Sequence, residues 1–398
     1  MTSPATRKDY LHQSAHHPLV SFVVPCYKLA HLLPECIRSI VNQTYPDFEI
    51  LIMDDCSPDD TAGVVHSLKD PRIAYIRNEQ NLGHLANYNK GIALSHGKYV
   101  WLISADDRIR RPYVLERYVR LMEAHPHVGY VCCPGIGLHG AEETGLVDSG
   151  YFGERDRIFR GRDFVAMSLQ HGYGLLSPAV MVRKDCYTKI SDFLLDMPHL
   201  GDWYLWLRWA LDYDIAYMSE PMVNYRLHDH NMMKDLLRRA PDTVFRDEVN
   251  LLWRTRHHCE QKGLHALASQ CEDILTAKYA RAAACAIYED VYWVWSDTFT
   301  RWGLSITQCD DALRKGAASE VDYNRLRRRF AVYMANQHWR HGNLERARQD
   351  YERVLHDKWK SPGVWAKWLL LRLGLGRVGI FLRSLQQRMD YRLRMRSA

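Results

Sequence analysis

The stretch that decides the fold is VSFVVPCYKLAHLLPECIRSIVNQTYPDFEILIMDD, residues 20–55. It opens on an apolar run, Val20–Val24, which predicts a buried strand that Pro25 ends. Apolar residues then recur at i, i+3, i+4, i+7 and i+8 from Leu33 to Val41, the spacing of an amphipathic helix. Glu49–Asp55 predicts a second buried strand, which ends in two carboxylates. A strand, a helix and a strand in this order favour a parallel sheet with helices on its faces.

The same alternation continues along the chain. Further strands are predicted at Ile73–Arg77, Tyr99–Ser104, Val128–Cys133 and Ala179–Arg183, and further helices at 83–96, capped by Asn81, and around 115–122. The expected fold class is α/β, with a mostly parallel sheet and helices on both faces, followed by an all-helical C-terminal region. Open sheets of this kind bind ligands at the carboxyl ends of their strands, where Asp54, Asp55, Asp106 and Asp107 are predicted to lie.

Composition excludes several classes of protein. The 398 residues carry a net charge of +6 and are 47% hydrophobic, values typical of a folded chain of two or three domains. No stretch of 18 uncharged apolar residues is present, and the first residues lack the apolar core of a signal peptide. The ten cysteines show no CxxC pair, so we expect reduced, buried thiols in a cytoplasmic protein.

The C-terminal part is predicted to be basic and helical. Residues 1–230 hold 23 Lys/Arg and 28 Asp/Glu, whereas residues 231–398 hold 30 and 19. Residues 330–362 resemble one tetratricopeptide-type helix pair. We expect four regions: an N-terminal tail (1–17), an α/β domain (18–235), a helical domain (236–362) and a basic amphipathic tail (363–398). The tail could lie on a membrane surface, dock to another protein or only increase solubility, and the sequence leaves these three roles open.

The paired carboxylates point to a cation and a phosphate-bearing ligand. Hard cations such as Mg²⁺ and Mn²⁺ take oxygen ligands and commonly share them with substrate phosphates. The chain contains no GxxxxGK[ST] loop, and no GxGxxG follows a predicted strand, so P-loop and Rossmann-type nucleotide sites are not expected. No nucleic-acid-binding motif accompanies the basic tail.

Four stretches in order resemble the family 2 glycosyltransferases, which have the GT-A fold and invert the anomeric centre. They are residues 20–61, residues 78–107 (NEQNLGHLANYNKGIALSHGKYVWLISADD), residues 200–211 (LGDWYLWLRWAL) and residues 225–231 (YRLHDHN). The resemblance covers roughly residues 18–235 and identifies them as a GT-A catalytic domain. It implies an enzyme that transfers a sugar from a UDP- or dTDP-activated donor to a hydroxyl group.

The resemblance also assigns roles to matching positions. The nucleotide sugar would contact Pro25, Tyr27, Asp54, Asp55, Asn81, Gly83, Asp106 and Arg226. A divalent cation, Mn²⁺ or Mg²⁺, would be bound by Asp106, Asp107 and His228. Asp202 would be the catalytic general base. Trp203, next to it, is a candidate for the acceptor side.

Three positions depart from the family pattern. Ser104 stands where many members have the first acid of a DxD motif, so metal binding would rest on Asp106 and Asp107. Gly201 replaces a glutamate that often precedes the catalytic aspartate, and Lys28 replaces a frequent asparagine. Ser104 and Gly201 support an alternative, a catalytically weakened scaffold that acts through its helical half. A nucleotidyltransferase is a further alternative, but PCYKLAHLLPE is not the Gly- and Lys/Arg-rich loop that it needs.

Structural explanations compete with several of these roles. Asp54 and Asp55 can simply end a strand and cap a turn, and Asp202 can cap the helix that follows it. Arg226 can form a structural ion pair. The tryptophans at 203, 206 and 209 are more often core than sugar platform. The expected acceptor is a glycan or lipid-linked glycan of a bacterial cell surface, reached from the cytoplasm or from the inner membrane face through residues 364–396.

Overall fold

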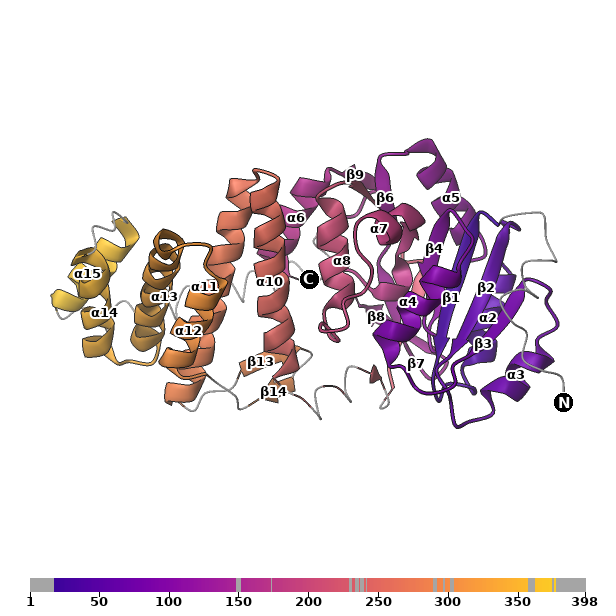
Figure 1. Ribbon diagram of the computed structural model, residues 1–398, viewed down its shortest axis with the longest axis horizontal. Coiled ribbons are helices and arrows are strands. Elements are labelled where there is room, and N and C mark those ends of the chain that lie inside the picture. The colour runs from indigo at the N-terminus through magenta and orange to yellow at the C-terminus, as the bar shows by residue number, and fades with distance from the viewer. Residues whose placement is uncertain are drawn as a thin grey trace. The chain divides into compact units, whose positions relative to one another are not determined.

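The computed structural model describes residues 18–147, 152–172, 174–228, 231–232, 236, 240, 242–288, 292–295, 298–300, 304–356, 362–373 and 376. The chain divides into two compact units, Met1–Arg238 and Arg239–Ala398. Figure 1 follows the chain from the indigo strands of the first unit to the orange and yellow helices of the second. Residues 1–17 and most of the predicted basic tail lie outside the described residues, as does its expected contact with a membrane surface.

The N-terminal unit is built on an eight-stranded sheet with the order β3-β2-β1-β4-β10-β6-β11-β9. Its strands are β1 (Val20–Cys26), β2 (Phe48–Asp54), β3 (Ile73–Arg77), β4 (Tyr99–Leu102), β6 (Val128–Cys132), β9 (Arg157–Phe159), β10 (Met181–Arg183) and β11 (Asp214–Tyr217). Strands β1 to β4 are parallel, as are β6 and β11. Strands β10 and β9 pair antiparallel with their neighbours. The predicted α/β fold is confirmed, with a mixed sheet that is parallel over its first half.

Helices bury both faces of this first half. They are α2 (Leu33–Val41), α3 (Thr61–Ser67), α4 (His84–Leu94) and α5 (Val114–Ala124). On one face Phe22 stacks on Trp101, and Trp101 stacks on Tyr118 of α5. On the other face α4 packs on β1 and β2. A Cβ atom on Gly91 of α4 would lie 2.5 Å from Val23 Cγ1, so this close approach requires glycine.

A second sheet, with the order β5-β12-β7-β8, lies in the same unit. Its strands are β5 (Arg108–Ile109), β7 (Gly135–His139), β8 (Glu142–Leu146) and β12 (Val223–Arg226). Strand β12 pairs antiparallel with β5, with Asn224 opposite Arg108. Because β5 directly follows Asp107 and β12 leads into His228, this pairing brings the two segments together. The remaining helices of the unit are α6 (Gly161–His171), α7 (Lys184–Lys189) and α8 (Gly201–Ala210), with a 3-10 turn at Ser177–Ala179.

The C-terminal unit consists mainly of helices. They are α10 (Thr243–Gln261), α11 (His265–Tyr288), α12 (Ile306–Gly316), α13 (Glu320–Arg340), α14 (Leu344–His356) and α15 (Pro362–Arg372). A short hairpin, β13 (Tyr292–Trp295) with β14 (Thr298–Thr300), corrects the prediction of an all-helical region. Helices α13 and α14 turn at Gly342, whose φ of +78° favours glycine, and form the predicted helix pair. Pro362 begins α15 instead of ending that pair.

Three local predictions are wrong. Strand β1 continues through Pro25 to Cys26, and the Pro25 carbonyl still accepts from Ala105 N (3.2 Å). Asn81 does not cap α4, which begins after Gly83 without a side-chain cap. Asp202 does not cap α8 either, since the cap residue is Leu200 and Asp202 lies in the first turn. The ten cysteines are free, as predicted, and all but Cys56 are buried.

Candidate active site

The loops after β1 and β2 have unusual backbone conformations. Lys28 and Cys56, each two residues beyond its strand, have φ values of 59° and 57°, and they are the non-glycine residues with positive φ in the described part of the chain. The left-handed region is unfavourable for such residues and is enriched at functional sites. Ser57 links the two loops, because its hydroxyl accepts from Lys28 N at 2.7 Å. Tyr27, 41% exposed, lies on the first loop with the Lys28 amine over its ring.

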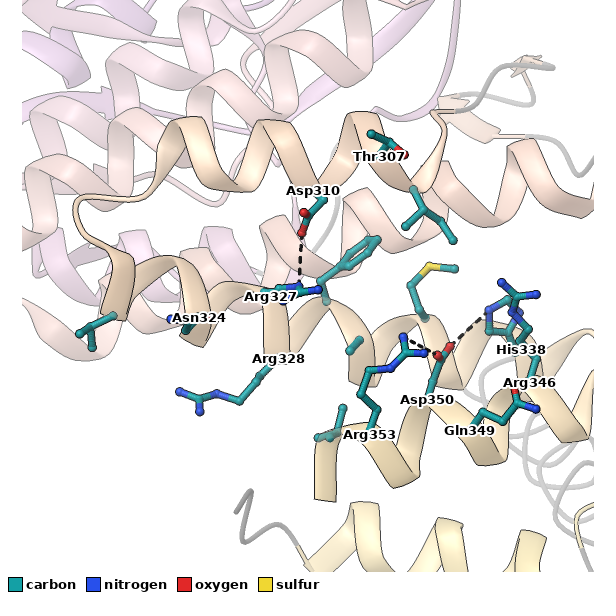
Figure 2. A pocket seen from close by; sticks show the side chains of 16 residues that line it. Thr307, Asp310, Asn324, Arg327, Arg328, His338, Arg346, Gln349, Asp350 and Arg353 are labelled. Carbon is teal, nitrogen blue, oxygen red and sulfur yellow. Dashed lines mark ion pairs between the residues drawn. The ribbon is translucent and has the colours of Figure 1, made fainter. Parts of the chain in front are cut away.

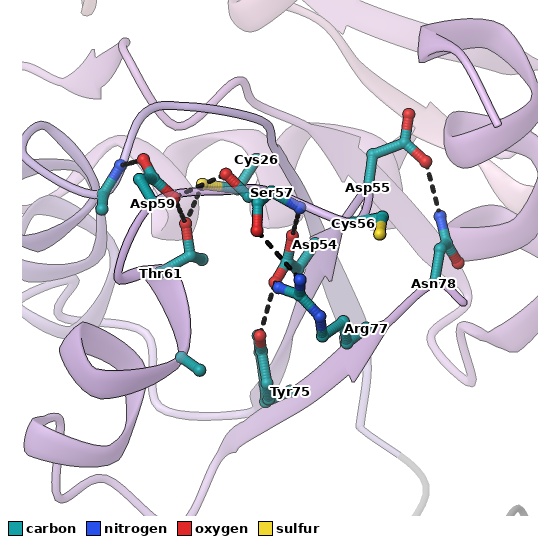
Figure 3. Close-up of polar contacts among 12 residues, drawn as sticks. Cys26, Asp54, Asp55, Cys56, Ser57, Asp59, Thr61, Tyr75, Arg77 and Asn78 are labelled. Carbon is teal, nitrogen blue, oxygen red and sulfur yellow. Dashed lines mark hydrogen bonds and ion pairs between the residues drawn. The ribbon is translucent and has the colours of Figure 1, made fainter. Parts of the chain in front are cut away.

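Asp54 is a buried anchor for the loop that follows β2 (Figure 3). Its side chain is 0% exposed and accepts from Ser57 N (2.7 Å), the Tyr75 hydroxyl (2.5 Å) and Arg77 Nη1 (2.5 Å). Tyr75 and Arg77 belong to β3, in which Arg77 is the register partner of Asp54. Hydrogen-bond donors of the protein therefore already occupy the Asp54 carboxylate. Its contact with the nucleobase or ribose of a bound nucleotide stays a prediction.

Asp55 organises the loop that leads into α4. Its Oδ1 accepts from Asn78 Nδ2 and Leu82 N, both at 2.8 Å, and its Oδ2 accepts from Gly83 N at 3.0 Å. Asn81 also binds this loop, because its Oδ1 accepts from Gly83 N and its Nδ2 donates to the Asp55 carbonyl. The structure thus brings the predicted residues Asp55, Asn81 and Gly83 together at the carboxyl end of β2.

Asp106 and His228 meet at the carboxyl end of β4. His228 Nε2 lies 3.0 Å from Asp106 Oδ2, although the two residues are 122 positions apart in the sequence. Asp106 Oδ1 is buried and has no hydrogen-bond partner among the described residues. A buried carboxylate oxygen without a donor is costly unless a ligand or ion completes it.

Asp107 and Arg226 hold this corner in place. Asp107 is buried and accepts from Arg226 N at 2.9 Å, and burial, followed by the charge of Asp106, raises the pKa of Asp107 well above its ordinary value. The Arg226 guanidinium is 7% exposed and donates to Glu35 Oε2 (2.5 Å), the Gly140 carbonyl (2.7 Å) and the Asp106 carbonyl (2.8 Å). Arg226 therefore stabilises the loop of Asp106 through these hydrogen bonds. Its contact with a diphosphate stays a prediction.

Asp202 lies in the first turn of α8. Burial raises its pKa from 3.8 to about 6, although hydrogen bonds from Trp203 N (2.7 Å) and the Ser177 side chain lower it. Raised pKa values of this size are common for carboxylates that exchange protons with a substrate.

Two tyrosines connect Asp202 with the Asp106 corner. Burial, followed by the charges of Asp106, Asp202 and Asp107, raises the pKa of Tyr88 above its usual range. Burial and the same three carboxylates raise the pKa of Tyr225 as well. All three carboxylates therefore lie within electrostatic range of the same two phenols.

Trp203 is not an open platform. It is 5% exposed, and its ring packs edge-on against Trp206 at 5.3 Å. A side chain with so little exposed surface favours the core interpretation, and an acceptor-side role of Trp203 stays a prediction. The core interpretation of the tryptophans at 203, 206 and 209 fits the structure, because all three are buried.

Sequence reasoning missed several residues that support the site. Glu35 of α2 accepts from both Arg226 and Arg108 and so ties the first helix to the second sheet. Asn231 holds the loop of His228, since its Oδ1 accepts from His228 N (2.7 Å) and its Nδ2 donates to the Arg226 carbonyl (3.0 Å). Asn231 is the last residue of the YRLHDHN stretch, so the resemblance of this stretch to the family could have indicated that Asn231 supports the site.

The site fits a divalent cation that is shared with a ligand. Asp106 offers one carboxylate oxygen without a donor, and His228 offers an imidazole on the same corner. In the part of the chain that the structure describes, no three His, Cys, Asp or Glu side chains are placed so that they alone could hold a metal ion. Mg²⁺ and Mn²⁺ sites with one or two protein ligands are completed by substrate phosphates and water.

The N-terminal unit is similar in sequence and in fold to known glycosyltransferases. The sequence profile of Glycosyl transferase family 2 matches residues 21–174. An uncharacterized glycosyltransferase of Haemophilus influenzae is 28% identical over 217 residues, which are 53% of this chain and 66% of that protein. The putative colanic acid biosynthesis glycosyl transferase WcaA of Escherichia coli is 37% identical over 94 residues, 23% of this chain and 34% of that protein.

A crystal structure of S. aureus TarS in complex with UDP has the same fold, with a TM-score of 0.53 and 15% identity over 86% of this chain and 93% of that chain. Residues 21–174 are therefore similar to glycosyl transferase family 2, in agreement with the resemblance seen in the sequence. None of the helices in the described ranges is long and apolar enough to cross a membrane.

Proposed function

We propose that this protein is an inverting glycosyltransferase that moves a sugar from a UDP- or dTDP-sugar to a hydroxyl of a glycan or lipid-linked acceptor. The observation that carries the proposal is the corner of Asp106 and His228, which leaves a buried Asp106 oxygen without a donor, within electrostatic range of the same tyrosines as Asp202. Asp106 and His228 form a corner that can bind a diphosphate together with a cation, and Asp202 is a carboxylate that can accept a proton.

Asp202 would be the general base. With a pKa of about 6 its carboxylate is ionised at neutral pH yet is basic enough to accept a proton. The bond from Trp203 N to its Oδ1 fixes its orientation. As the acceptor oxygen bonds to the anomeric carbon, its proton passes to Asp202, and the bond from that carbon to the diphosphate oxygen breaks with its electron pair. Attack opposite the leaving group inverts the anomeric centre.

Asp106 and His228 would hold Mn²⁺ or Mg²⁺, with Asp107 as a further predicted ligand. When bound, the cation neutralises negative charge on the departing diphosphate. Arg226 keeps the Asp106 loop in place through its bond to the Asp106 carbonyl. The nucleoside would be held by the loop of Asp55, Asn81 and Gly83. Pro25 and Tyr27, at the carboxyl end of the neighbouring strand β1, would contact it as well.

Similar proteins support the substrate classes. TarS has been crystallised with UDP, and WcaA is named for colanic acid biosynthesis, so we infer a uridine-type donor and a cell-surface polysaccharide. The structure also speaks against the scaffold alternative, because the Asp106 oxygen without a donor and the raised pKa of Asp202 are retained.

Calorimetric titration of the full chain with UDP, dTDP, GDP and CDP, each with and without Mn²⁺, tests the proposal. We expect binding of UDP or dTDP that strengthens with Mn²⁺ and weakens in Asp106→Ala. Binding of GDP or CDP alone would contradict the donor assignment, and no binding of any nucleotide would favour the scaffold.

A further inference from the structure

Helices α12, α13 and α14 of the C-terminal unit surround an open cavity of about 990 Å³ (Figure 2). Every residue that lines it lies between Ile306 and Val354, so the cavity belongs to this unit alone. Phe330, Met334 and Val354 are buried and form part of its lining. We call this cavity the α12–α14 groove.

The polar lining of the groove is cationic. Arg327 and Arg328 come from α13, and Arg346 and Arg353 come from α14, whereas lysine is absent from the lining. Burial lowers the pKa of His338, which also lines the groove, to about 4, so this side chain adds no charge near neutral pH. Four guanidinium groups therefore face or border a single cavity.

The two acidic residues of the lining neutralise only part of this charge. Asp310 lies 3.7 Å from Arg327, and Asp350 lies 3.6 Å from Arg353. Arg328 and Arg346 form no ion pair with a carboxylate of the described residues, although Arg346 acts on Asp350 over a longer distance. Figure 2 shows Arg328 extending away from both aspartates. The groove therefore carries two guanidinium groups whose charge an incoming anion can satisfy.

The lining also limits the chemistry of the ligand. Guanidinium groups bind carboxylates and phosphates through paired N–H donors. The volume lies near the upper end of that of ligand pockets and far exceeds what one inorganic ion fills. The exposed aliphatic side chains of Ile306 and Val321 favour a ligand with apolar side chains. The exposed amides of Asn324 and Gln349 can pair with peptide groups. An acidic peptide with apolar side chains combines these properties, whereas a phosphorylated glycan lacks the apolar part.

Charge argues against the chain's own ends as occupants. Residues 377–398 contain six arginines and one aspartate, and residues 1–17 contain one arginine, one lysine and one aspartate. Both segments carry net positive charge and would be repelled by the arginines of the groove.

We propose that the α12–α14 groove is a docking site for an acidic, leucine-containing peptide segment of a partner protein. The carboxylates of the segment pair with Arg328 and Arg346, and its apolar side chains lie against the exposed side chains of Ile306 and Val321. The proposal rests on residues of the C-terminal unit alone and does not depend on the proposed sugar transfer.

Fluorescence anisotropy with the full chain tests the proposal. The probe is a fluorescein-labelled peptide of alternating glutamate and leucine, and its matched control carries glutamine in place of glutamate. We expect the acidic peptide to bind more tightly, with an affinity that falls as salt rises. The double variant Arg328→Ala/Arg346→Ala should lose roughly tenfold in affinity, as expected for two charge-assisted contacts at a partly exposed rim.

Arg340→Ala is the control variant, because Arg340 is an exposed arginine of α13 outside the groove. Thermal melting checks that each variant is folded, and Arg346→Glu, a change at an exposed side chain, provides a second test. Equal binding of both peptides, or an equal loss in Arg340→Ala, would overturn the proposal. So would binding of inorganic polyphosphate at these arginines without binding of the acidic peptide, which would assign the groove to a phosphorylated polymer.

Discussion

Replacing Asp202 by asparagine separates the catalytic role of this carboxylate from the cost of burying it. Asparagine keeps an oxygen that can accept from Trp203 N, where the present bond is 2.7 Å, so the start of α8 should stay intact. The variant cannot accept a proton. General-base catalysis contributes about 10²–10⁴-fold, so we expect the sugar-transfer rate to fall by that factor, or by about 3–5 kcal/mol.

The same substitution should stabilise the protein at neutral pH. Burial raises the pKa of Asp202 from 3.8 to about 6, so the folded state holds a proton that the unfolded state has released between these values. The free energy of unfolding therefore falls as pH rises through this interval, and above pH 6 the cost reaches about 3 kcal/mol. The asparagine variant does not carry this cost, so its advantage should be large at pH 7.5 and small near pH 4.

Urea denaturation at both pH values and the pH profile of kcat/KM provide the measurements. Wild-type kcat/KM should fall below about pH 6, because protonated Asp202 cannot act as a base, and the residual activity of Asp202→Asn should lack this limb. Asp192→Asn, at an exposed aspartate, is the matched control and should change neither quantity. A stability difference that does not vary with pH, or a variant that transfers sugar at the wild-type rate, would refute the reasoning.

Three further substitutions test other parts of the structure. His228→Ala should weaken the apparent Mn²⁺ affinity in activity titrations by roughly 10–100-fold, and an unchanged Mn²⁺ dependence would remove His228 from the metal corner. Arg226→Ala should lower the free energy of unfolding, measured in urea, by about 2 kcal/mol, because Glu35 and two carbonyls lose the hydrogen bonds that Arg226 donates. Unchanged stability together with lost binding of the nucleotide sugar would instead make Arg226 a ligand contact. Gly91→Ala places a Cβ atom 2.5 Å from Val23 Cγ1 and should lower the free energy of unfolding by about 1–3 kcal/mol. Gly145→Ala, the control, has open space around its Cβ position and should leave the stability almost unchanged. Equal effects of the two substitutions would contradict the packing of α4 on β1.

The first half of the fold was predictable because its strands are buried on both faces. Such strands appear in the sequence as continuous apolar runs, and β1 to β4 lie close to their predicted positions. The second sheet was not predictable, because β5 has two residues and every residue of β8 is exposed, so neither produces a periodic pattern.

The candidate site was only partly predictable. The acidic residues at the strand ends were identified from the pattern, and Asp202 and His228 came from the family resemblance. The sequence contains no signal that Tyr75 and Arg77 occupy Asp54, because these contacts depend on the register between β2 and β3. The pairing of Asp106 with His228 likewise depends on the short β5–β12 ladder.

The central claim is that one site joins a diphosphate-binding corner at Asp106 with a general base at Asp202. The most direct test is the rate of nucleoside diphosphate release from a panel of UDP- and dTDP-sugars with Mn²⁺, compared between the wild type, Asp106→Ala and Asp202→Asn. We expect the wild type to release nucleoside diphosphate from at least one donor and both variants to show near-background rates, with nucleotide binding weakened only in Asp106→Ala. Wild-type rates in either variant, or no release from any donor by the wild type, would contradict it.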